Sequence, residues 1–233
     1  MTDRVTEVPP AAAAYADGID YERLYEYRFR DIDQDGRIAV WKEISPHVHG
    51  VMGRPQKVLD PAAGRGEFIG AVPARETWAV DAVAYEQAMY KPDTKVVTAS
   101  IMDAELPPDH FDGVFVSNFL EHLYDQEAIA AFLEKMRDAM ERGGRIAIMG
   151  PNHRYCSDEY WDCADHYVAL THVAIGEHLY AAGFEIDRMI PRYLPYSFRG
   201  ILPPSPQLTK MYLQMPLAWK LLGKQFLVIG RKP

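Results

Sequence analysis

The stretch VLDPAAGRGEF, Val58–Phe68, decides how the chain folds. It predicts a short strand that ends at Asp60, a turn that contains Gly64 and Gly66, and a helix directly after it. Glycines in such a turn let a ligand approach the backbone while N–H groups point at an anion. A generic loop of small residues is the simpler interpretation. A dinucleotide-binding G-x-G-x-x-G pattern would need glycine at position 69, where Ile69 stands, so a nicotinamide-dependent oxidoreductase is the weaker alternative.

Short apolar runs rich in Val and Ile recur along the chain and are typical of buried parallel strands. They cover residues 57–60, 77–81, 95–99, 111–117, 145–150, 184–190 and 224–231. Helices are predicted between them at 67–76, at 125–144 with Gly143-Gly144 as its stop, and from the N-cap Thr171 to Gly183. This alternation predicts an α/β fold with a doubly wound parallel sheet, whose ligands bind outside the carboxyl ends of the strands.

The N-terminal part has a different character. Residues 1–20 are rich in Pro and Ala without periodicity, and we expect a flexible tail. Two short helices are predicted within residues 21–54, joined by the acidic turn DIDQDGR at 31–37. This turn begins like an EF-hand calcium loop, but its twelfth position, which requires a bidentate Glu, is Lys42. A solvated acidic turn is therefore preferred to a calcium-responsive binding module.

Composition and charge restrict the function. With 233 residues, 48% apolar and 25% charged, the chain fits one globular domain, expected to span residues 21–233. The net charge of −8 argues against a nucleic-acid partner, which usually meets a basic surface. There are two cysteines, and we find neither a signal peptide nor a long apolar run. Together these predict a cytoplasmic protein.

The segment VLDPAAGRG, residues 58–66, resembles the first motif of class I S-adenosylmethionine-dependent methyltransferases. That motif reads apolar-apolar-Asp-x-Gly-x-Gly-x-Gly, and the chain departs from it at Ala62, where the first glycine usually stands. The resemblance covers about residues 55–192 and the last strand. It implies a Rossmann-like, seven-stranded sheet, mostly parallel with an antiparallel last strand, plus N-terminal helices. It also implies S-adenosylmethionine as cofactor, bound in this loop by Asp60, Ala62, Gly64 and Gly66.

Further positions match the family in order along the chain. The resemblance implies that Asp81 binds the ribose hydroxyls, that Asp103 lies near the adenine, and that Asn118 lies below the sulfonium. Residues 21–54 resemble an N-terminal helical lid found in relatives that look to be of polysaccharide and secondary-metabolite pathways. Arg28 belongs to that lid pattern and is assigned to cofactor binding.

The chemistry expected of such an enzyme is the transfer of a methyl group to a hydroxyl, in preference to an amine, of a small, sugar-like or lipid-linked acceptor. A hydroxyl acceptor benefits from a general base. His122, after the fourth strand, and His166, in the loop after the fifth, are the candidates. The alternative is that His122 has only a structural role, as a residue at the start of a helix whose hydrogen bond is already satisfied.

The loop HRYCSDEYWDCADHYVALTH, residues 153–172, mixes aromatic and acidic side chains and suits a small or glycan-like acceptor. It also holds His153, Cys156, Cys163 and His166, but the spacing H-x2-C-x6-C-x2-H matches no common zinc motif. A magnesium-dependent variant of the fold would need a carboxylate where Asn118 stands. No metal is therefore predicted.

Residues 193–223 form an insertion before the last strand, and long insertions in compact domains tend to be functional. The segment combines aromatic residues and leucines with lysines, Trp219 and Lys220 among them. Packing on the sheet or lid, or against a second subunit in a homodimer, is the plainer interpretation. Contact with a membrane surface is the alternative, and Pro216 is expected to interrupt any helix there.

Overall fold

The computed structural model describes residues 20–84, 90–196 and 205–233. Apart from Asp20, the predicted flexible tail lies outside the described residues, as do residues 197–204 of the predicted insertion.

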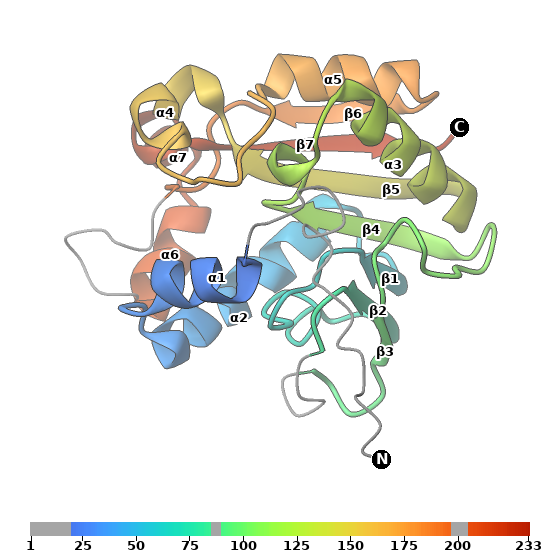
Figure 1. Cartoon of the computed structure of the whole chain (residues 1–233), viewed down its shortest axis with the longest axis horizontal. Helices are drawn as coiled ribbons and strands as arrows, with labels where there is room; N and C mark the ends of the chain where they lie inside the picture. The colour runs from blue at the N-terminus through green and yellow to red at the C-terminus, as the bar shows by residue number, and fades with distance from the viewer. Residues whose placement is uncertain (1–19, 85–89, 197–204) are drawn as a thin grey trace.

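Seven strands form a single sheet in the order β3-β2-β1-β4-β5-β7-β6 (Figure 1). The strands are β1 (Lys57–Asp60), β2 (Glu76–Asp81), β3 (Lys95–Thr98), β4 (Phe111–Ser117), β5 (Met140–Pro151), β6 (Glu185–Ile190) and β7 (Gln225–Arg231). Neighbouring strands from β3 to β5 pair in parallel, whereas β7 is antiparallel to β5 and β6. The predicted fold class, including the antiparallel last strand, is confirmed.

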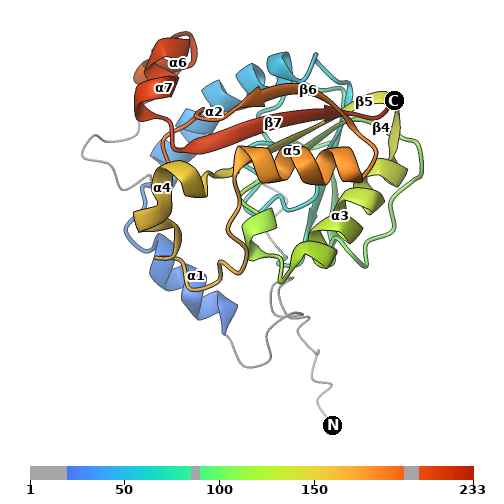
Figure 2. The same ribbon diagram turned by 90° about the horizontal axis from the view of Figure 1, so that it is seen from above.

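Helices cover both faces of this sheet (Figure 2). On one face, α3 (Gln126–Ala139) and α5 (His172–Ala181) bury apolar residues against the strands. On the other, α2 (Gln34–Val51) buries Val40, Trp41, Ile44 and Val48 against β1, β4 and β7. Burial of two such apolar layers is the main force that holds the sheet in place.

Two helix predictions were wrong in detail. The helix expected at 67–76 is only a series of turns, because Pro73 lacks an N–H and pushes Val72 toward an extended conformation. Helix α3 ends at Ala139, before the predicted stop, since Met140 already pairs with β4. Gly144 lies in β5 instead, where it allows close approach to β4: a Cβ there would lie 3.0 Å from the carbonyl oxygen of Phe111.

The N-terminal helices are α1 (Tyr21–Phe29) and α2, and the acidic turn joins them. Asp33 is the N-cap of α2, where its side chain accepts a hydrogen bond from the Gly36 N–H at 3.0 Å. Because α2 already begins at Gln34, a twelve-residue calcium loop starting at Asp31 does not form. The structure agrees with the preferred interpretation of an exposed acidic turn between helices.

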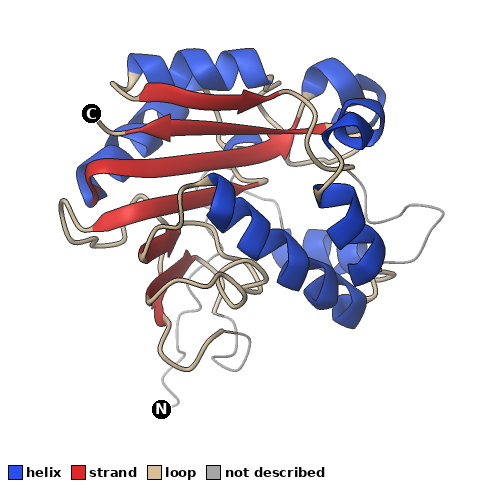
Figure 3. Cartoon of the chain, turned by 180° about the vertical axis from the view of Figure 1, so that it is seen from behind, coloured by secondary structure: helices blue, strands red, loops and turns tan. Residues whose placement is uncertain are grey.

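Short helices gather at one end of the long strands, as Figure 3 shows from behind. They follow the strands or precede β7: η3 (Leu120–His122), α4 (His153–Tyr160), α6 (Pro206–Leu213) and α7 (Pro216–Leu222). Pro216 begins α7 and so separates it from α6, as its position in the sequence predicted. This end of the sheet carries the carboxyl termini of β1, β4 and β5, where ligands of such folds bind.

Candidate functional site

The loop after β1 has the backbone shape expected of a ligand-binding turn. Gly64 and Gly66 adopt positive φ angles of 52° and 77°, a region that favours glycine. A Cβ added at Gly64 would meet no heavy atom within 4 Å, so the space over this residue is open to a ligand. Ala62 fits the loop without disturbing it, and its N–H lies 3.4 Å from the Asp60 carboxylate.

Asp81, at the end of β2, fixes the same loop. Its carboxylate accepts hydrogen bonds from the Gly64 N–H at 2.7 Å and from the Val83 N–H at 2.9 Å. Burial raises the pKa of Asp81, and these N–H donors act against that rise. A carboxylate has about four lone-pair sites, so two backbone bonds leave capacity for further hydroxyl donors.

Asp60, the last residue of β1, is buried, with 4% of its surface exposed. Burial raises the pKa of its carboxyl well above the usual range, and the nearby carboxylates of Asp81 and Glu67 raise it further. An acidic group held where its ionisation is unfavourable is a mark of functional sites. The carboxylates of Asp60 and Asp81 and the open backbone at Gly64 suit a ligand with amine and hydroxyl donors.

The other two predicted cofactor residues are less constrained. Asn118 follows β4 with a positive φ of 50°, and its exposed side chain donates a hydrogen bond to Ser117. Asp103 is exposed in the loop after β3. Their assignment to the cofactor stays a prediction.

A second group of polar residues lies at the carboxyl ends of β4 and β5. Asp165, fully buried, forms an ion pair with Arg28 of α1 through both oxygens. Burial opposes ionisation of Asp165, yet His122 and Arg28 together lower its pKa below the usual value. The arginine assigned to the cofactor thus holds a residue of the predicted acceptor loop.

The two candidate histidines lie beside Asp165. Nδ1 of His122 is 2.8 Å from the Asp165 carbonyl oxygen and 3.3 Å from its carboxylate, and the rings of His122 and His166 are 4.9 Å apart. His166 is buried, and its Nδ1 has no hydrogen-bond partner. Burial, with a further contribution from His122, lowers the pKa of His166 to about 4, so His166 is neutral at pH 7. The structure therefore brings both predicted catalytic residues together.

Glu121 completes this group and was missed as a site residue. It is 2% exposed, and burial raises the pKa of its carboxyl. Within the described ranges, Glu121, His122 and His166 are the one set of potential metal ligands found close together, with ligand atoms within 4.8 Å of one another. The disfavoured zinc set of His153, Cys156, Cys163 and His166 does not form such a group there. The absence of a metal stays a prediction.

The acceptor loop contains two cysteines. Both are free, and burial raises the pKa of Cys156 to about 12, so its thiol stays protonated at neutral pH. The sulfur of Cys163 lies 3.6 Å from the Tyr196 hydroxyl, at the start of the predicted insertion. Covalent catalysis by a thiolate is therefore not available to Cys156.

The two helices predicted to form a lid, α1 and α2, contact both groups of the site. Arg28 of α1 binds Asp165, while Arg37 of α2 pairs with Glu67 of the glycine loop at 2.6 Å. Each of these four side chains is no more than 20% exposed. The predicted lid helices are thus attached to the cofactor loop at one point and to the acceptor loop at another.

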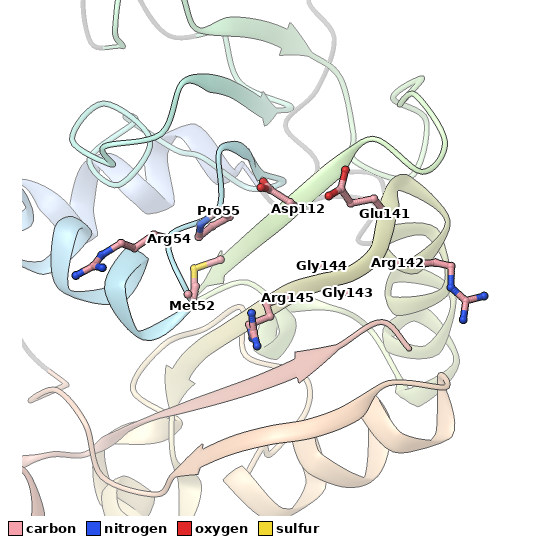
Figure 4. A pocket seen from close by; sticks show the side chains of 10 residues that line it. Met52, Arg54, Pro55, Asp112, Glu141, Arg142, Gly143, Gly144 and Arg145 are labelled. Atoms are coloured by element: carbon pink, nitrogen blue, oxygen red, sulfur yellow. The ribbon is translucent and has the colours of Figure 1, made fainter.

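A separate hollow lies at the other end of the sheet, near the amino ends of β1 and β4 (Figure 4). It is bordered by Arg54, Asp112, Glu141 and Arg145, among others, and has a volume of about 220 Å³. Ligands of this fold bind at the opposite, carboxyl ends of the strands. We therefore assign the functional site to the two groups described above.

Comparison with known proteins agrees with this geometry. Residues 59–148 match the family model described as a methyltransferase domain. This range contains the glycine loop, Asp81, Asp103, Asn118 and His122. No curated protein is significantly similar to the chain in sequence.

Solved structures share the fold at low identity. A SAM-dependent methyltransferase from Archaeoglobus fulgidus is 20% identical with a TM-score of 0.63, covering 91% of this chain and 100% of that one. The 1,6-didemethyltoxoflavin-N1-methyltransferase of Burkholderia thailandensis, solved with S-adenosylhomocysteine, is 20% identical with a TM-score of 0.56, covering 91% and 89%. The [4+2]-cyclase SpnF, at 14% identity and a TM-score of 0.57, covers 82% and 80%. The fold alone thus leaves the acceptor open.

Proposed function

We propose that the chain is an S-adenosylmethionine-dependent methyltransferase and that it methylates a hydroxyl of a small, sugar-like acceptor, which the matching methyltransferase-domain model and the shared fold support. The observation that carries this proposal is the His122–His166 pair beside the buried Asp165, at the carboxyl ends of β4 and β5. A histidine pair held by a carboxylate is suited to take a proton from a hydroxyl.

The cofactor half of the site is assigned from its donors and acceptors. The remaining acceptor capacity of Asp81 would receive the ribose hydroxyls, and the open backbone at Gly64 would lie against the cofactor. Asp60 would accept from the cofactor's amine donors. When bound, S-adenosylmethionine supplies a methyl group on a sulfonium, whose leaving group is a neutral thioether that needs no acid.

The acceptor half is assigned from its hydrogen bonds. Nδ1 of His122 donates to Asp165, which leaves Nε2 as the free lone pair and favours His122 as the base. Asp165 orients the ring and stabilises the charge that His122 gains, as a buried carboxylate does in hydrolase triads. His166, neutral and buried, packs its ring against that of His122 and would position the base toward the acceptor. The proton passes from the acceptor oxygen to His122 as the oxygen gains its methyl group.

An amine acceptor is the second candidate. It is favoured by the N-methyltransferase among the similar structures. An uncharged amine already carries a free lone pair and gains less from a base than a hydroxyl does. The oriented His122–Asp165 pair therefore supports the hydroxyl, and a panel of sugars and amines would separate the two.

The test has two stages. Calorimetry should show that the wild type binds S-adenosylhomocysteine, and no binding at millimolar ligand would remove the proposal. His122→Gln should then lower kcat by about a hundredfold or more with unchanged affinity for S-adenosylhomocysteine. His178→Gln, on the outer helix α5, is the matched control and should keep full activity. Full activity of His122→Gln would exclude His122 as the base.

A further inference from the structure

The helices α6 and α7 expose an unusual amount of apolar surface. Large apolar side chains there are 48% to 76% exposed. They are Leu208, Met211, Met215, Leu217, Leu221 and Leu222, which we call the α6–α7 face. Leu208 and Met211 are three residues apart on α6, and Leu217 and Leu221 are four apart on α7, so each helix directs an apolar side outward. Met215 lies between the two helices. In Figure 1 both helices lie at the end of the sheet that carries the site.

The opposite sides of these helices are firmly packed. Leu213 and Trp219 are buried, and the Trp219 indole N–H donates to the Tyr212 carbonyl at 2.8 Å. The Tyr212 hydroxyl donates to the Tyr193 carbonyl at 2.6 Å. The helices are therefore anchored through one side, and the exposure of the other side is a property of the folded chain.

The charge of this region differs from that of the whole protein. The chain has a net charge of −8, yet all 33 acidic residues precede Arg188. All charged side chains after that point are lysines or arginines. Two of them, Lys210 on α6 and Lys220 on α7, are exposed. A segment that combines exposed leucines with lysines and contains no carboxylate of its own is complementary to an anionic lipid surface.

The face is also joined to the acceptor half of the site. Lys224, just after α7, forms an ion pair with Glu159 of α4, and the Asn152 N–H donates to the Lys224 carbonyl at 2.9 Å. Tyr196, from the same segment, contacts Cys163 of the acceptor loop. Whatever covers the α6–α7 face is therefore held next to the acceptor loop.

We propose that the α6–α7 face docks on an anionic lipid bilayer. None of the helices in the described ranges is long and apolar enough to cross a membrane, so the contact would be peripheral. A second copy of the chain is less suited, because a two-fold contact through this face would bring two lysine-bearing faces of like charge together. Docking would bring the acceptor loop to the membrane surface. If the proposed hydroxyl transfer also holds, the acceptor is a lipid-linked glycan, a consequence that rests on that proposed function.

The experiment measures binding to vesicles without cofactor or acceptor. The wild type should co-sediment with phosphatidylglycerol vesicles, bind far less to phosphatidylcholine vesicles, and be released by high salt. Leu217→Ser with Leu221→Ser, and separately Lys210→Glu with Lys220→Glu, should each reduce the partition coefficient by at least about tenfold. Tyr180→Ser is the matched control, since Tyr180 is 76% exposed on α5, and it should bind as the wild type does.

The outcomes distinguish a lipid bilayer from a second copy of the chain as the partner of the α6–α7 face. Wild type that remains in the supernatant at low salt overturns the proposal. So does a dimer in light scattering that Leu217→Ser with Leu221→Ser converts to a monomer, because the face would then be covered by a second copy. Binding of S-adenosylhomocysteine, measured on the same variants, reports on the methyltransferase site independently of vesicle binding.

Discussion

Two turns of this chain combine aspartates with glycine and look alike as sequence, yet they differ in structure. In DPAAGRG, residues 60–66, Asp60 is buried and both glycines adopt positive φ. In DIDQDG, residues 31–36, the aspartates are exposed and Gly36 lies in the first turn of α2. The first follows a central strand of the sheet, and the second leads into a helix.

The difference shows what makes such a motif a site. In the turn at 31–36, the Gly36 N–H is already satisfied by Asp33, and the backbone continues as helix. In the loop at 60–66, Gly64 has open space above it, and its N–H is held by a side chain from the next strand. Acidic residues and glycine mark a binding site only where the fold buries the acid and leaves the backbone accessible.

The largest expected effect is on the free energy of unfolding, and it compares an Asp→Asn substitution in each of the two turns. Asp60→Asn should stabilise the cofactor-free protein at about pH 8, because an uncompensated buried carboxylate is costly to ionise. The unfolded carboxyl ionises near pH 4, whereas the folded Asp60 keeps its proton to higher pH. The wild type therefore loses stability as pH rises above about 4. The difference in free energy of unfolding between Asp60→Asn and the wild type should become smaller as pH falls toward about 4.

Asp33→Asn is the control, because Asn caps a helix about as well as Asp. Its free energy of unfolding should stay close to that of the wild type at every pH, by denaturant titration. Asp60→Asn should in turn bind S-adenosylhomocysteine more weakly than the wild type. An Asp60→Asn protein less stable than the wild type at about pH 8 would contradict the effect of burial.

The second effect is on the cofactor. Asp81→Ala should weaken binding of S-adenosylhomocysteine by about 1 to 3 kcal/mol, roughly 5- to 150-fold, because buried hydroxyls would lose a charged acceptor. Calorimetry measures it, with Asp33→Ala as the control that should bind normally. Unchanged affinity in Asp81→Ala would remove this residue from the site.

These effects also show which parts of the molecule the sequence could predict. The strands were predictable because short Val- and Ile-rich runs become buried parallel strands, and the glycine loop follows from its position after the first of them. The helix at 67–76 was predicted wrongly because Pro73 leaves only a series of turns before it, an effect that outweighs the local helical pattern.

The acceptor half was less predictable because its contacts are long-range. Arg28 and Asp165 are 137 residues apart, and nothing local distinguishes Asp165 from Asp158 or Asp162 in the same loop. The two acid–histidine pairs, at 121–122 and 165–166, were the available signal. For the segment 193–223, packing was the plainer interpretation and membrane contact the alternative: Trp219 is packed and buried, whereas the leucines on either side of it are exposed.

A smaller effect contrasts the glycines of the two turns. Gly64→Ala should destabilise the protein by about 1 to 2 kcal/mol, because its φ of 52° is unfavourable for a residue with a Cβ. Gly36→Ala should instead stabilise it by about 0.4 to 1 kcal/mol, since helical backbone suits alanine and the unfolded chain loses freedom. Thermal or urea unfolding of both variants tests this, and effects of the same sign would show that the two glycines do not differ as described.

The smallest effect tests whether the turn at 31–36 does more than begin a helix. Asp33→Ala removes the N-cap of α2 and should lower the free energy of unfolding by about 1 kcal/mol. Calcium at millimolar concentration should leave the melting temperatures of the wild type and of Asp33→Ala unchanged, because Lys42 occupies the position where a calcium loop needs its bidentate carboxylate. Asp31→Ala, which removes a carboxylate that caps no helix, should cost less than Asp33→Ala. A calcium-dependent rise in the wild-type melting temperature that Asp33→Ala abolishes would instead make this turn a binding site and remove the contrast with the loop at 60–66.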